Sequence, residues 1–466
     1  MNYFLAGIKG SGMSHLARYL VQGGHTVSGC DVPEDFFTSV LLDGISVLPS
    51  DCSLPDDADC LIYSTSYGSR PLPCMTQAEE RGIEVLDYPH ALARLSADRI
   101  TVGICGTHGK STTCAAASWL GQDAGLCAGS VYGSFLQKSG TVWHDGDRGL
   151  VIEACEYQDH FMLYDLDALV ITSIAWDHPD WFEDLDAVRK SFRNRIAAMG
   201  RGAAVFYHDS LGRLARDWRS ERPDITFIPY GPHSQVSLNR NADGSFGVTG
   251  CAASFSSAQR SAKILYDYLA GLLAVSCLSL MLSSVPVDEA ALSEAMEDFI
   301  PHLSGFPGLV GRQEVLFEED GVTYIDDYAH HPDEIRVCID SLRRGYPGKR
   351  IICLFKSHTD SRTLSMLRDF ALALARCNAV FVQETFAARG DGGQESALRL
   401  YKALDRQVFR SFYGRLDVAC YTPTDREAVM AAASCLQSGD IMLTLGAGNN
   451  RHLAYEIAKE RRKALL

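Results

Sequence analysis

The sequence predicts an α/β protein of three domains, each built on a parallel sheet. Strand-like and helix-like stretches alternate along the chain, two glycine-rich turns join a strand to a helix, and 466 residues suffice for about three domains. The alternation restarts twice, and the restarts mark the expected boundaries. We expect a Rossmann-like domain over 1–98, a central P-loop domain over 99–302 and a second Rossmann-like domain over 303–466.

Each expected domain has its own series of elements. In the first, strands are expected at 3–8, 25–31, 59–66 and 83–88, with a helix at 13–23. In the second, strands are expected at 100–105, 150–154 and 167–177, helices at 115–125 and 186–200, a hairpin region at 241–257 and a buried helix at 265–282. After a glycine-rich linker at 302–314, the third has strands at 322–329, 350–355, 379–386 and 440–448 and helices at 333–345 and 367–377. The acidic run at 318–320 is expected in a solvated loop.

The composition favours small-molecule partners. A net charge of -15 without any basic run argues against a nucleic-acid surface, which needs clustered Lys and Arg. The 15 cysteines are scattered without metal-ligand spacing, so we expect mostly reduced core thiols. No leader peptide and no run of about 18 apolar residues is evident. We therefore expect a soluble, cytoplasmic protein, a monomer or homodimer without membrane insertion.

The first glycine-rich turn follows the strand at 3–8. Gly7, Gly10 and Gly12 would let backbone N–H groups at a helix start approach a pyrophosphate. Asp31, at the end of the next strand, stands where an acidic residue often meets a ribose. The spacing is G-x-x-G-x-G and not the dinucleotide pattern G-x-G-x-x-G, so the glycines could also serve only a tight turn.

The second turn, GTHGKST, joins the strand at 100–105 to a helix. Here Lys110 can bridge β and γ phosphates, and the Ser111 hydroxyl can ligate Mg²⁺, while Gly106 and Gly109 let the backbone wrap the phosphates. The fit to G-x-x-x-x-G-K-[ST] is imperfect, because the first glycine of the pattern falls on Ile104. The strand-to-helix context nevertheless favours a phosphate loop.

Metal-binding side chains are expected at the ends of the neighbouring strands. Glu153 and Glu156 follow one strand, and Asp177 and His178 follow another. Singly, each could be a surface carboxylate or a satisfied loop histidine. Their joint occurrence after a phosphate loop favours a metal site.

The ordered series GTHGKST, EACEY, SIAWDHPDW, DDYAHHPDEI, SHTDSRT and LGAG resembles the Mur ligases of peptidoglycan synthesis. The opening GIKGSGMSHLARYLVQGGHTVSGCD is most similar to the branch that joins L-alanine to UDP-N-acetylmuramate. The resemblance covers nearly the whole chain. It implies a UDP-binding domain, a central ATPase domain and a C-terminal ligase domain, with ATP and Mg²⁺ used to convert a carboxylate into an acyl phosphate that an amine attacks.

The same resemblance implies roles for individual residues. It assigns the UDP-sugar to Gly7, Gly10, Ser11, Gly12, Asp31 and Ser64, and ATP to Gly106, Thr107, His108, Gly109, Lys110, Ser111, Thr112, Arg312, Asp327 and His330. It assigns Mg²⁺ to Ser111, Glu153 and His178, catalysis to Lys110, Glu153 and His178 with Glu156 in support, and the amino acid to His358 and Arg362. The alternatives are a polar turn for Asp327, an exposed linker residue for Arg312 and ordinary surface pairing for His358 and Arg362.

Two departures from the family pattern stand out. The HN-x-x-N phrase that faces adenine in related enzymes is replaced by Tyr266, Asp267 and Ala270, and Thr359 replaces an arginine of the amino-acid segment. Three other functions are therefore weighed: a recycling ligase that attaches an intact peptide to the same nucleotide sugar, a binding protein without turnover, and an NAD-dependent dehydrogenase. The dehydrogenase leaves GTHGKST, Glu153 and His178 without a role.

Overall fold

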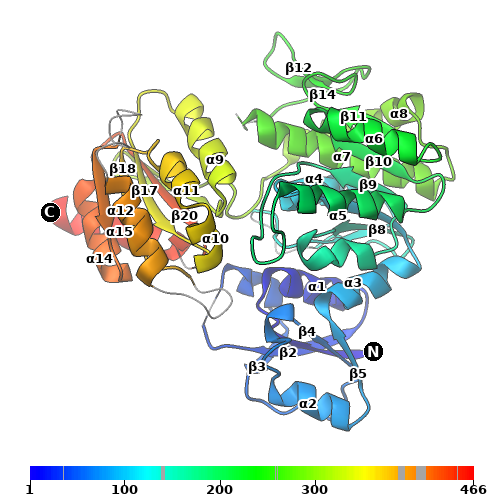
Figure 1. The fold of residues 1–466 in the computed structure, drawn as a ribbon, viewed down its shortest axis with the longest axis horizontal. Coiled ribbons are helices and arrows are strands. Elements are labelled where there is room, and N and C mark those ends of the chain that lie inside the picture. The colour runs from blue at the N-terminus through cyan, green and yellow to red at the C-terminus, as the bar shows by residue number, and fades with distance from the viewer. Residues whose placement is uncertain are drawn as a thin grey trace. The chain divides into compact units, whose positions relative to one another are not determined.

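Three large, predominantly parallel sheets organise the chain, which Figure 1 colours from blue to red along the sequence. The structure is a computed structural model that describes residues 1–34, 36–137, 142–257, 259, 261–386, 394–405, 416–448 and 450–465. The residues group into two compact units, Met1–Trp176 with Asp184–Leu309 and Asp177–Glu183 with Val310–Leu466. The first unit contains two of the sheets and the second unit the third, so the expected α/β fold class is confirmed.

The first sheet has five parallel strands in the order β3-β2-β1-β4-β5. Its elements are β1 Asn2–Ala6, α1 Ser11–Gln22, β2 Thr26–Asp31, β3 Ser46–Pro49, β4 Cys60–Tyr63, α2 Pro73–Glu80, β5 Glu84–Asp87 and α3 Tyr88–Ala97. The strand order reverses beside β1, which pairs with both β2 and β4. The glycine turn after β1 therefore lies at the switch point where parallel sheets bind their ligands.

The second sheet has six parallel strands in the order β11-β10-β9-β6-β8-β7. Its strands are β6 Ile100–Cys105, β7 Gly129–Val131, β8 Gly149–Glu153, β9 Ala168–Ile171, β10 Ala204–His208 and β11 Thr226–Tyr230. Its helices are α4 Lys110–Asp123, α5 Leu185–Ala197, α6 Gly212–Glu221, α7 Ala262–Leu282 and α8 Glu289–Phe299. Because β6 lies between β9 and β8, the ends of these three strands meet at one edge of the sheet. β9 ends at Ile171, six residues before the end of the expected strand, and leaves 172–176 free to contact the loop after β6.

The expected hairpin region and buried helix are both present. The short strands β12 Leu238–Arg240, β13 Phe246–Val248 and β14 Ser254–Phe255 form an antiparallel sheet. The helix α7 is long and apolar enough to cross a membrane by length and composition, but 78% of its most apolar window is buried inside the protein. It packs in the hydrophobic core with α4, as is typical of a core helix.

The third sheet has the order β15-β16-β20-β17-β18-β19. Its elements are β15 Glu314–Glu319, β16 Val322–Asp327, α9 Pro332–Gly345, β17 Ile351–Lys356, α10 Asp360–Ser365, α11 Leu367–Leu374, β18 Ala379–Val382, α12 Gln394–Asp405, β19 Val418–Tyr421, α14 Asp425–Cys435, β20 Ile441–Gly446 and α15 Asn450–Leu465. β15 is an antiparallel edge strand that the sequence analysis treated as linker and solvated loop, and this interpretation of 318–320 is wrong for Glu318 and Glu319. Charged residues suit an edge strand, since one of its sides carries no partner strand.

Candidate active site

The loop after β6 has the geometry of a phosphate loop. Gly106 has φ 128°, and a Cβ there would lie 2.3 Å from Thr172 Oγ1, so only glycine fits. Gly109, with φ 91°, caps the start of α4, which begins at Lys110. The N–H groups at this helix start have no partners within the helix and favour an anion.

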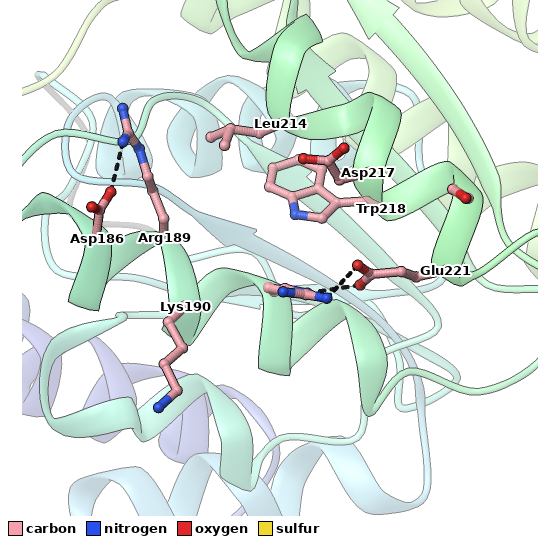
Figure 2. A pocket seen from close by; sticks show the side chains of 9 residues that line it. Asp186, Arg189, Lys190, Leu214, Asp217, Trp218 and Glu221 are labelled. Atoms are coloured by element: carbon pink, nitrogen blue, oxygen red, sulfur yellow. Dashed lines mark hydrogen bonds and ion pairs between the residues drawn. The ribbon is translucent and has the colours of Figure 1, made fainter.

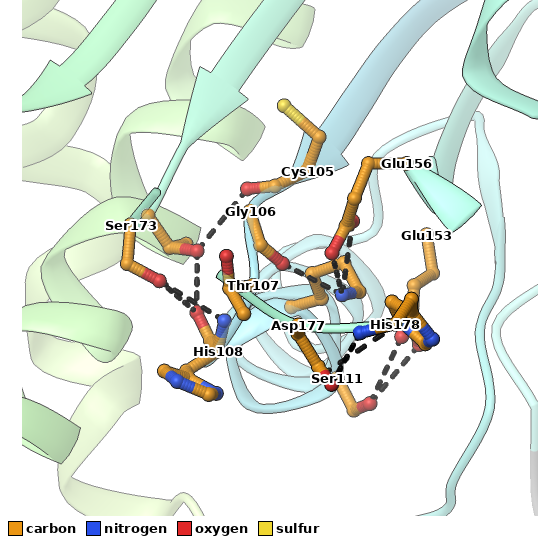
Figure 3. A network of polar contacts seen from close by, with 12 residues as sticks. Cys105, Gly106, Thr107, His108, Ser111, Glu153, Glu156, Ser173, Asp177 and His178 are labelled. Carbon is orange, nitrogen blue, oxygen red and sulfur yellow. Dashed lines mark hydrogen bonds and ion pairs between the residues drawn. The ribbon is translucent and has the colours of Figure 1, made fainter. Parts of the chain in front are cut away.

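The residues after β9 support this loop through hydrogen bonds (Figure 3). The N–H of Thr107 donates to the Ser173 carbonyl (3.1 Å) and that of His108 to Ser173 Oγ (3.0 Å). Thr172 Oγ1 donates to the His108 carbonyl (2.5 Å). The sequence analysis did not identify Thr172 and Ser173, although two hydroxyl residues in ITSIAWD, where a strand beside β6 ends, are a usable signal.

Lys110 is held inside the protein by a carboxylate. Its Nζ lies 3.1 Å from Glu156 Oε2 and 2.6 Å from the Gly106 carbonyl, and its side chain is only 12% exposed. Burial by itself would lower the pKa of Lys110, but the Glu156 charge outweighs it and the pKa is raised. The ammonium therefore keeps its positive charge beside the loop. Glu156, expected as a supporting residue, is the partner of this lysine.

Ser111 and Glu153 lie together, as the expected metal site requires. Ser111 Oγ lies 3.0 and 3.2 Å from the two Glu153 carboxylate oxygens, and the N–H of Gly133 donates to Glu153 Oε2 (2.9 Å). A hydroxyl and a carboxylate are hard oxygen ligands of the kind that Mg²⁺ prefers. The pair therefore fits the ion. The third expected ligand, His178, belongs to the second compact unit and is described with it.

The first glycine turn is a tight loop closed by side chains. Gly7 has φ 82°, and a Cβ there would lie 2.8 Å from both Ser64 and Tyr67, so the glycine is required. Asp31 Oδ2 accepts the N–H of Lys9 (2.7 Å), and its Oδ1 accepts that of Val32 (2.8 Å). The carboxylate of Asp31 thus stabilises the turn itself. The sequence analysis did not identify Tyr67.

The helix start of the first turn lies near the Glu153 side chain within the same unit. A Cβ placed on Gly133 would lie 3.6 Å from Ser11 Oγ and 3.5 Å from Glu153 Oε2, so both groups flank Gly133. Ser11 is the first residue of α1. A ligand bound at the first turn could therefore extend toward the phosphate loop.

In the second unit, Arg362 forms a buried ion pair with Asp177. Arg362 Nε lies 2.8 Å from Asp177 Oδ1 and Nη2 lies 3.1 Å from Oδ2, with the two side chains 6% and 7% exposed. Despite burial, Arg362 holds the pKa of Asp177 well below its usual range. Among the residues that the structure describes, the buried Nη1 of Arg362 has no hydrogen-bond partner. Arg362 is thus not a surface residue, and its Nη1 group is available to donate to a further acceptor.

His178 adopts a rare backbone conformation. Its φ is 54°, in the left-handed region that few residues other than glycine adopt. The conformation is held because the His178 N–H donates to Asp177 Oδ1 (2.6 Å) and its carbonyl accepts from Trp181 (2.8 Å) and Phe182 (2.9 Å). Strain of this kind is concentrated at functional sites.

The other expected residues of the third sheet also gather in this unit. The His330 and His358 rings lie 5.1 Å apart, and burial lowers the pKa of His330 to about 4, so His330 is neutral at pH 7. Arg312 lies over the Tyr328 ring at 5.9 Å. Asp327 accepts hydrogen bonds from the N–H groups of Gln313 (3.1 Å) and Ala329 (2.8 Å). These contacts form the polar turn that was the alternative role for Asp327.

The departures on α7 have structural consequences near the loop. A Cβ on Gly109 would lie 2.5 Å from Asp267 Oδ1, so this carboxylate adjoins the loop directly. Tyr266 Oη lies 3.2 Å from Ser237 Oγ, and its ring meets the edge of His208 at 6.0 Å. Ala270 is fully buried. The residues that replace the HN-x-x-N phrase thus contribute an aromatic ring (Tyr266), a carboxylate (Asp267) and a buried methyl group (Ala270).

A groove of about 460 Å³ lies between α5 and α6, lined by Asp186, Arg189, Lys190, Arg193, Leu214, Asp217, Trp218, Ser220 and Glu221. Figure 2 shows Arg189 turned toward Asp186, a pair 2.7 Å apart. Arg193 is paired with Glu221. None of the expected site residues lines this groove, and two of its cations are already neutralised.

Two family profiles match the chain. The profile of the Mur ligase family, catalytic domain, matches residues 3–99, and that of the Mur ligase, glutamate ligase domain, matches 311–448. A UDP-N-acetylmuramate–L-alanine ligase of Treponema pallidum is 31% identical over 472 residues, covering 96% of this chain and 94% of the relative. The ligase of the same name from Desulfitobacterium hafniense is 31% identical over 465 residues, covering 96% and 97%.

Solved structures are similar over the whole chain. The UDP-N-acetylmuramate–alanine ligase of Thermotoga maritima has a TM-score of 0.70 at 19% identity, with 100% of both chains covered. A murein peptide ligase of Psychrobacter arcticus has a TM-score of 0.67 at 18% identity, covering 100% of this chain and 98% of the other. At these identities the similarity demonstrates a shared fold.

Proposed function

The chain belongs to the Mur ligase family, and from that membership we propose that it joins L-alanine to UDP-N-acetylmuramate at the expense of ATP. The product is an amide, and the reaction belongs to peptidoglycan synthesis in the cytoplasm. The observation that carries the proposal is the loop that brings Lys110 and the Ser111–Glu153 pair together at one helix start. The same relatives, 31% identical over 96% of this chain, support L-alanine as the amino acid.

The chemistry requires activation of a poor leaving group. A carboxylate oxygen of the muramoyl group attacks the γ-phosphorus of ATP, ADP leaves, and an acyl phosphate remains. The amine of L-alanine then attacks the acyl carbon, and inorganic phosphate leaves with the C–O electron pair as the amide forms. Mg²⁺, when bound by Ser111 and Glu153, neutralises phosphate charge.

Lys110 is the cation that we assign to the phosphoryl group in transfer. Its raised pKa keeps it charged at neutral pH, and its contact with Glu156 aims the ammonium at the loop. The N–H groups at the start of α4, which begins at Lys110, add fixed dipoles for the phosphates. Gly106, Thr107, His108, Gly109, Lys110, Ser111 and Thr112 are the proposed triphosphate-binding residues. Arg312 is proposed as a further contact to the ATP phosphates, with Asp327 facing the ribose and His330 at the edge of the nucleotide.

The first turn is the proposed site of the nucleotide sugar. Gly7, Gly10, Ser11, Gly12, Asp31 and Ser64 are the proposed binding residues. The start of α1 offers N–H groups to the diphosphate, and Ser11 and Glu153 flank the same glycine. That arrangement supports delivery of the muramoyl carboxylate to the phosphate loop.

The amino acid is assigned to the second unit. The free Nη1 of Arg362, next to an Asp177 carboxylate already bound in bidentate geometry, supports recognition of a second carboxylate by the same guanidinium. His358 is the proposed second contact. His178 is the proposed third metal ligand, on the strength of its strained backbone.

The three sheets support a division into domains at 1–98, 99–302 and 303–466, which we propose as the boundaries of the UDP-sugar, ATP and ligase domains.

An assay of phosphate release tests the function. With ATP, Mg²⁺ and UDP-N-acetylmuramate present, L-alanine should trigger phosphate release, while glycine, L-serine and a free tripeptide should do so weakly. Release with the tripeptide and none with L-alanine would establish the recycling reaction instead. Binding of UDP-N-acetylmuramate without release under any condition would identify a binding protein.

A further inference from the structure

Three cysteine thiols lie close together next to the first glycine turn. Cys30 is the last residue but one of β2, Cys74 is the second residue of α2, and Cys52 follows β3. The sulfur atoms of Cys30 and Cys74 lie 3.9 Å apart, and the Cys52 thiol adjoins that of Cys30. Cys30 and Cys74 are fully buried, whereas Cys52 is partly exposed. All 15 cysteines are free thiols, and the proposed ligase reaction uses none of these three.

The surroundings of the pair distinguish its two thiols. The Cys30 thiol and the N–H groups of Cys74 and Met75 at the start of α2 stabilise a negative charge on Cys74 and lower its pKa. Hydrogen bonding to Cys74 raises the pKa of Cys30. The 3.9 Å contact between the two sulfur atoms and the position of Cys74 at the start of α2 distinguish this pair from two cysteines that only pack in a core.

We propose that Cys30 and Cys74 form a reversible oxidation site that closes a disulfide when a peroxide oxidises the protein. The Cys74 thiolate attacks a peroxide oxygen, the O–O bond breaks, and a sulfenic acid and water form. The Cys30 sulfur then attacks the Cys74 sulfur, the S–O bond breaks, and a second water leaves. The two thiols lose two protons and two electrons, and hydrogen peroxide is reduced to two waters.

Closure of this disulfide is expected to disturb the glycine turn through Cys30. The sulfur atoms have to approach from 3.9 Å to about 2 Å, which moves Cys30, Cys74 or both. The Cys30 carbonyl accepts the N–H groups of Gly7 (2.8 Å) and Ile8 (3.3 Å), so Cys30 directly supports the turn. Loss of ligand affinity on oxidation is the consequence, and this part rests on the proposed role of the turn in binding the nucleotide sugar.

Peptide mapping tests the site without any ligand. The full chain is treated with hydrogen peroxide, denatured in N-ethylmaleimide, digested without reductant and analysed by mass spectrometry. We expect a linked Cys30–Cys74 peptide that disappears when dithiothreitol is added before alkylation. Recovery of both residues in alkylated form, or a Cys30–Cys52 link in its place, would overturn the proposal.

Calorimetric titration with UDP-N-acetylmuramate tests the consequence. We expect peroxide to weaken binding about tenfold, the value of one hydrogen bond to a charged group, and dithiothreitol to restore it. Cys74→Ala should abolish both the link and the peroxide effect. Cys60→Ala is the matched control, since Cys60 is a buried thiol of the same sheet whose sulfur contacts the Leu61 carbonyl, and it should change neither.

The two proposals fail in different ways. If the reduced protein does not bind UDP-N-acetylmuramate, the function assigned to the first turn is wrong, while the peptide map still decides the oxidation site. If the link forms and binding is unchanged, the site stands and its effect on the turn is overturned.

Discussion

Two buried ion pairs dominate the candidate site at the scale of single residues. Lys110 with Glu156 and Arg362 with Asp177 each place a cation where solvent cannot compensate the loss of its partner. Neither pair is needed to form a helix or a strand. Buried charges of this kind are costly, which is the physical reason to assign them a chemical role.

Replacement of Lys110 by Met should separate its catalytic role from its structural one. We expect kcat to fall at least about a hundredfold, because a charge aimed at the phosphoryl group is lost. The buried Glu156 would also be left uncompensated and cost about 3–5 kcal/mol of unfolding free energy. The double variant Lys110→Met, Glu156→Gln should recover stability in urea denaturation but not phosphate release, and recovery of both would contradict the assignment.

Replacement of Arg362 by Lys should affect the amino acid more than ATP. A single ammonium cannot hold Asp177 through two nitrogens and also offer a third donor to the amino acid, so we expect the KM for L-alanine to rise about tenfold or more while the KM for ATP stays constant. The matched control is Arg336→Lys in α9, whose side chain is 51% exposed and pairs with Asp333 at the surface. An equal rise in both KM values would argue against a role in amino-acid binding.

At the scale of elements, the end of β16 concentrates negative charge. Asp326 and Asp327 are consecutive buried residues, and Glu314 on β15 lies opposite Asp326 in the strand register. Burial raises the pKa of Asp326 to about 7, although Arg451 lies 3.8 Å away, because the Arg451 guanidinium is already bound by Glu314. Below about pH 7, Asp326 therefore keeps a proton that an exposed carboxyl group would lose.

The sign of the resulting pH dependence follows from proton binding. An unfolded aspartate loses its proton near pH 3.9, whereas Asp326 in the folded protein keeps it up to about pH 7. Between these values the folded state binds more protons, so stability falls as pH rises, by about 1 kcal/mol per pH unit. Urea denaturation between pH 5 and 7 should show this slope, and Asp326→Asn should flatten it while keeping an acceptor for Thr444. An unchanged slope in the variant would place the proton elsewhere.

At the scale of the whole molecule, metal binding and folding should be separable. Ser111 and Glu153 hydrogen-bond to each other directly, and Gly133 supports the carboxylate, so the fold does not need an ion to hold them together. Removal of Mg²⁺ with EDTA should abolish phosphate release and leave the Tm within about 2 °C, a shift of no more than about 1 kcal/mol for a domain of about 200 residues. Unfolding on chelation would instead indicate a structural metal.

Much of this arrangement was predictable from the sequence. Period-two and helical patterns placed the strands around both glycine turns, and GTHGKST predicted a phosphate loop, because glycines at positive φ before a lysine at a helix start have few other uses. The order of motifs identified the family. The third sheet was also expected, apart from its two edge strands. The charged residues of β15 have no apolar alternation to reveal it, and no strand was expected at β19, Val418–Tyr421.

The sequence by itself determined the fold class, the family and the place of the glycine-rich loop between β6 and α4, since these depend on local patterns that each segment carries alone. Only the tertiary structure decided which charges pair. That Glu156 holds Lys110, that Asp177 holds Arg362 across 185 positions, and that Cys30 meets Cys74 depend on segments distant in sequence packing beside one another. Long-range contacts of this kind arise from the packing of whole elements, and no local periodicity encodes them.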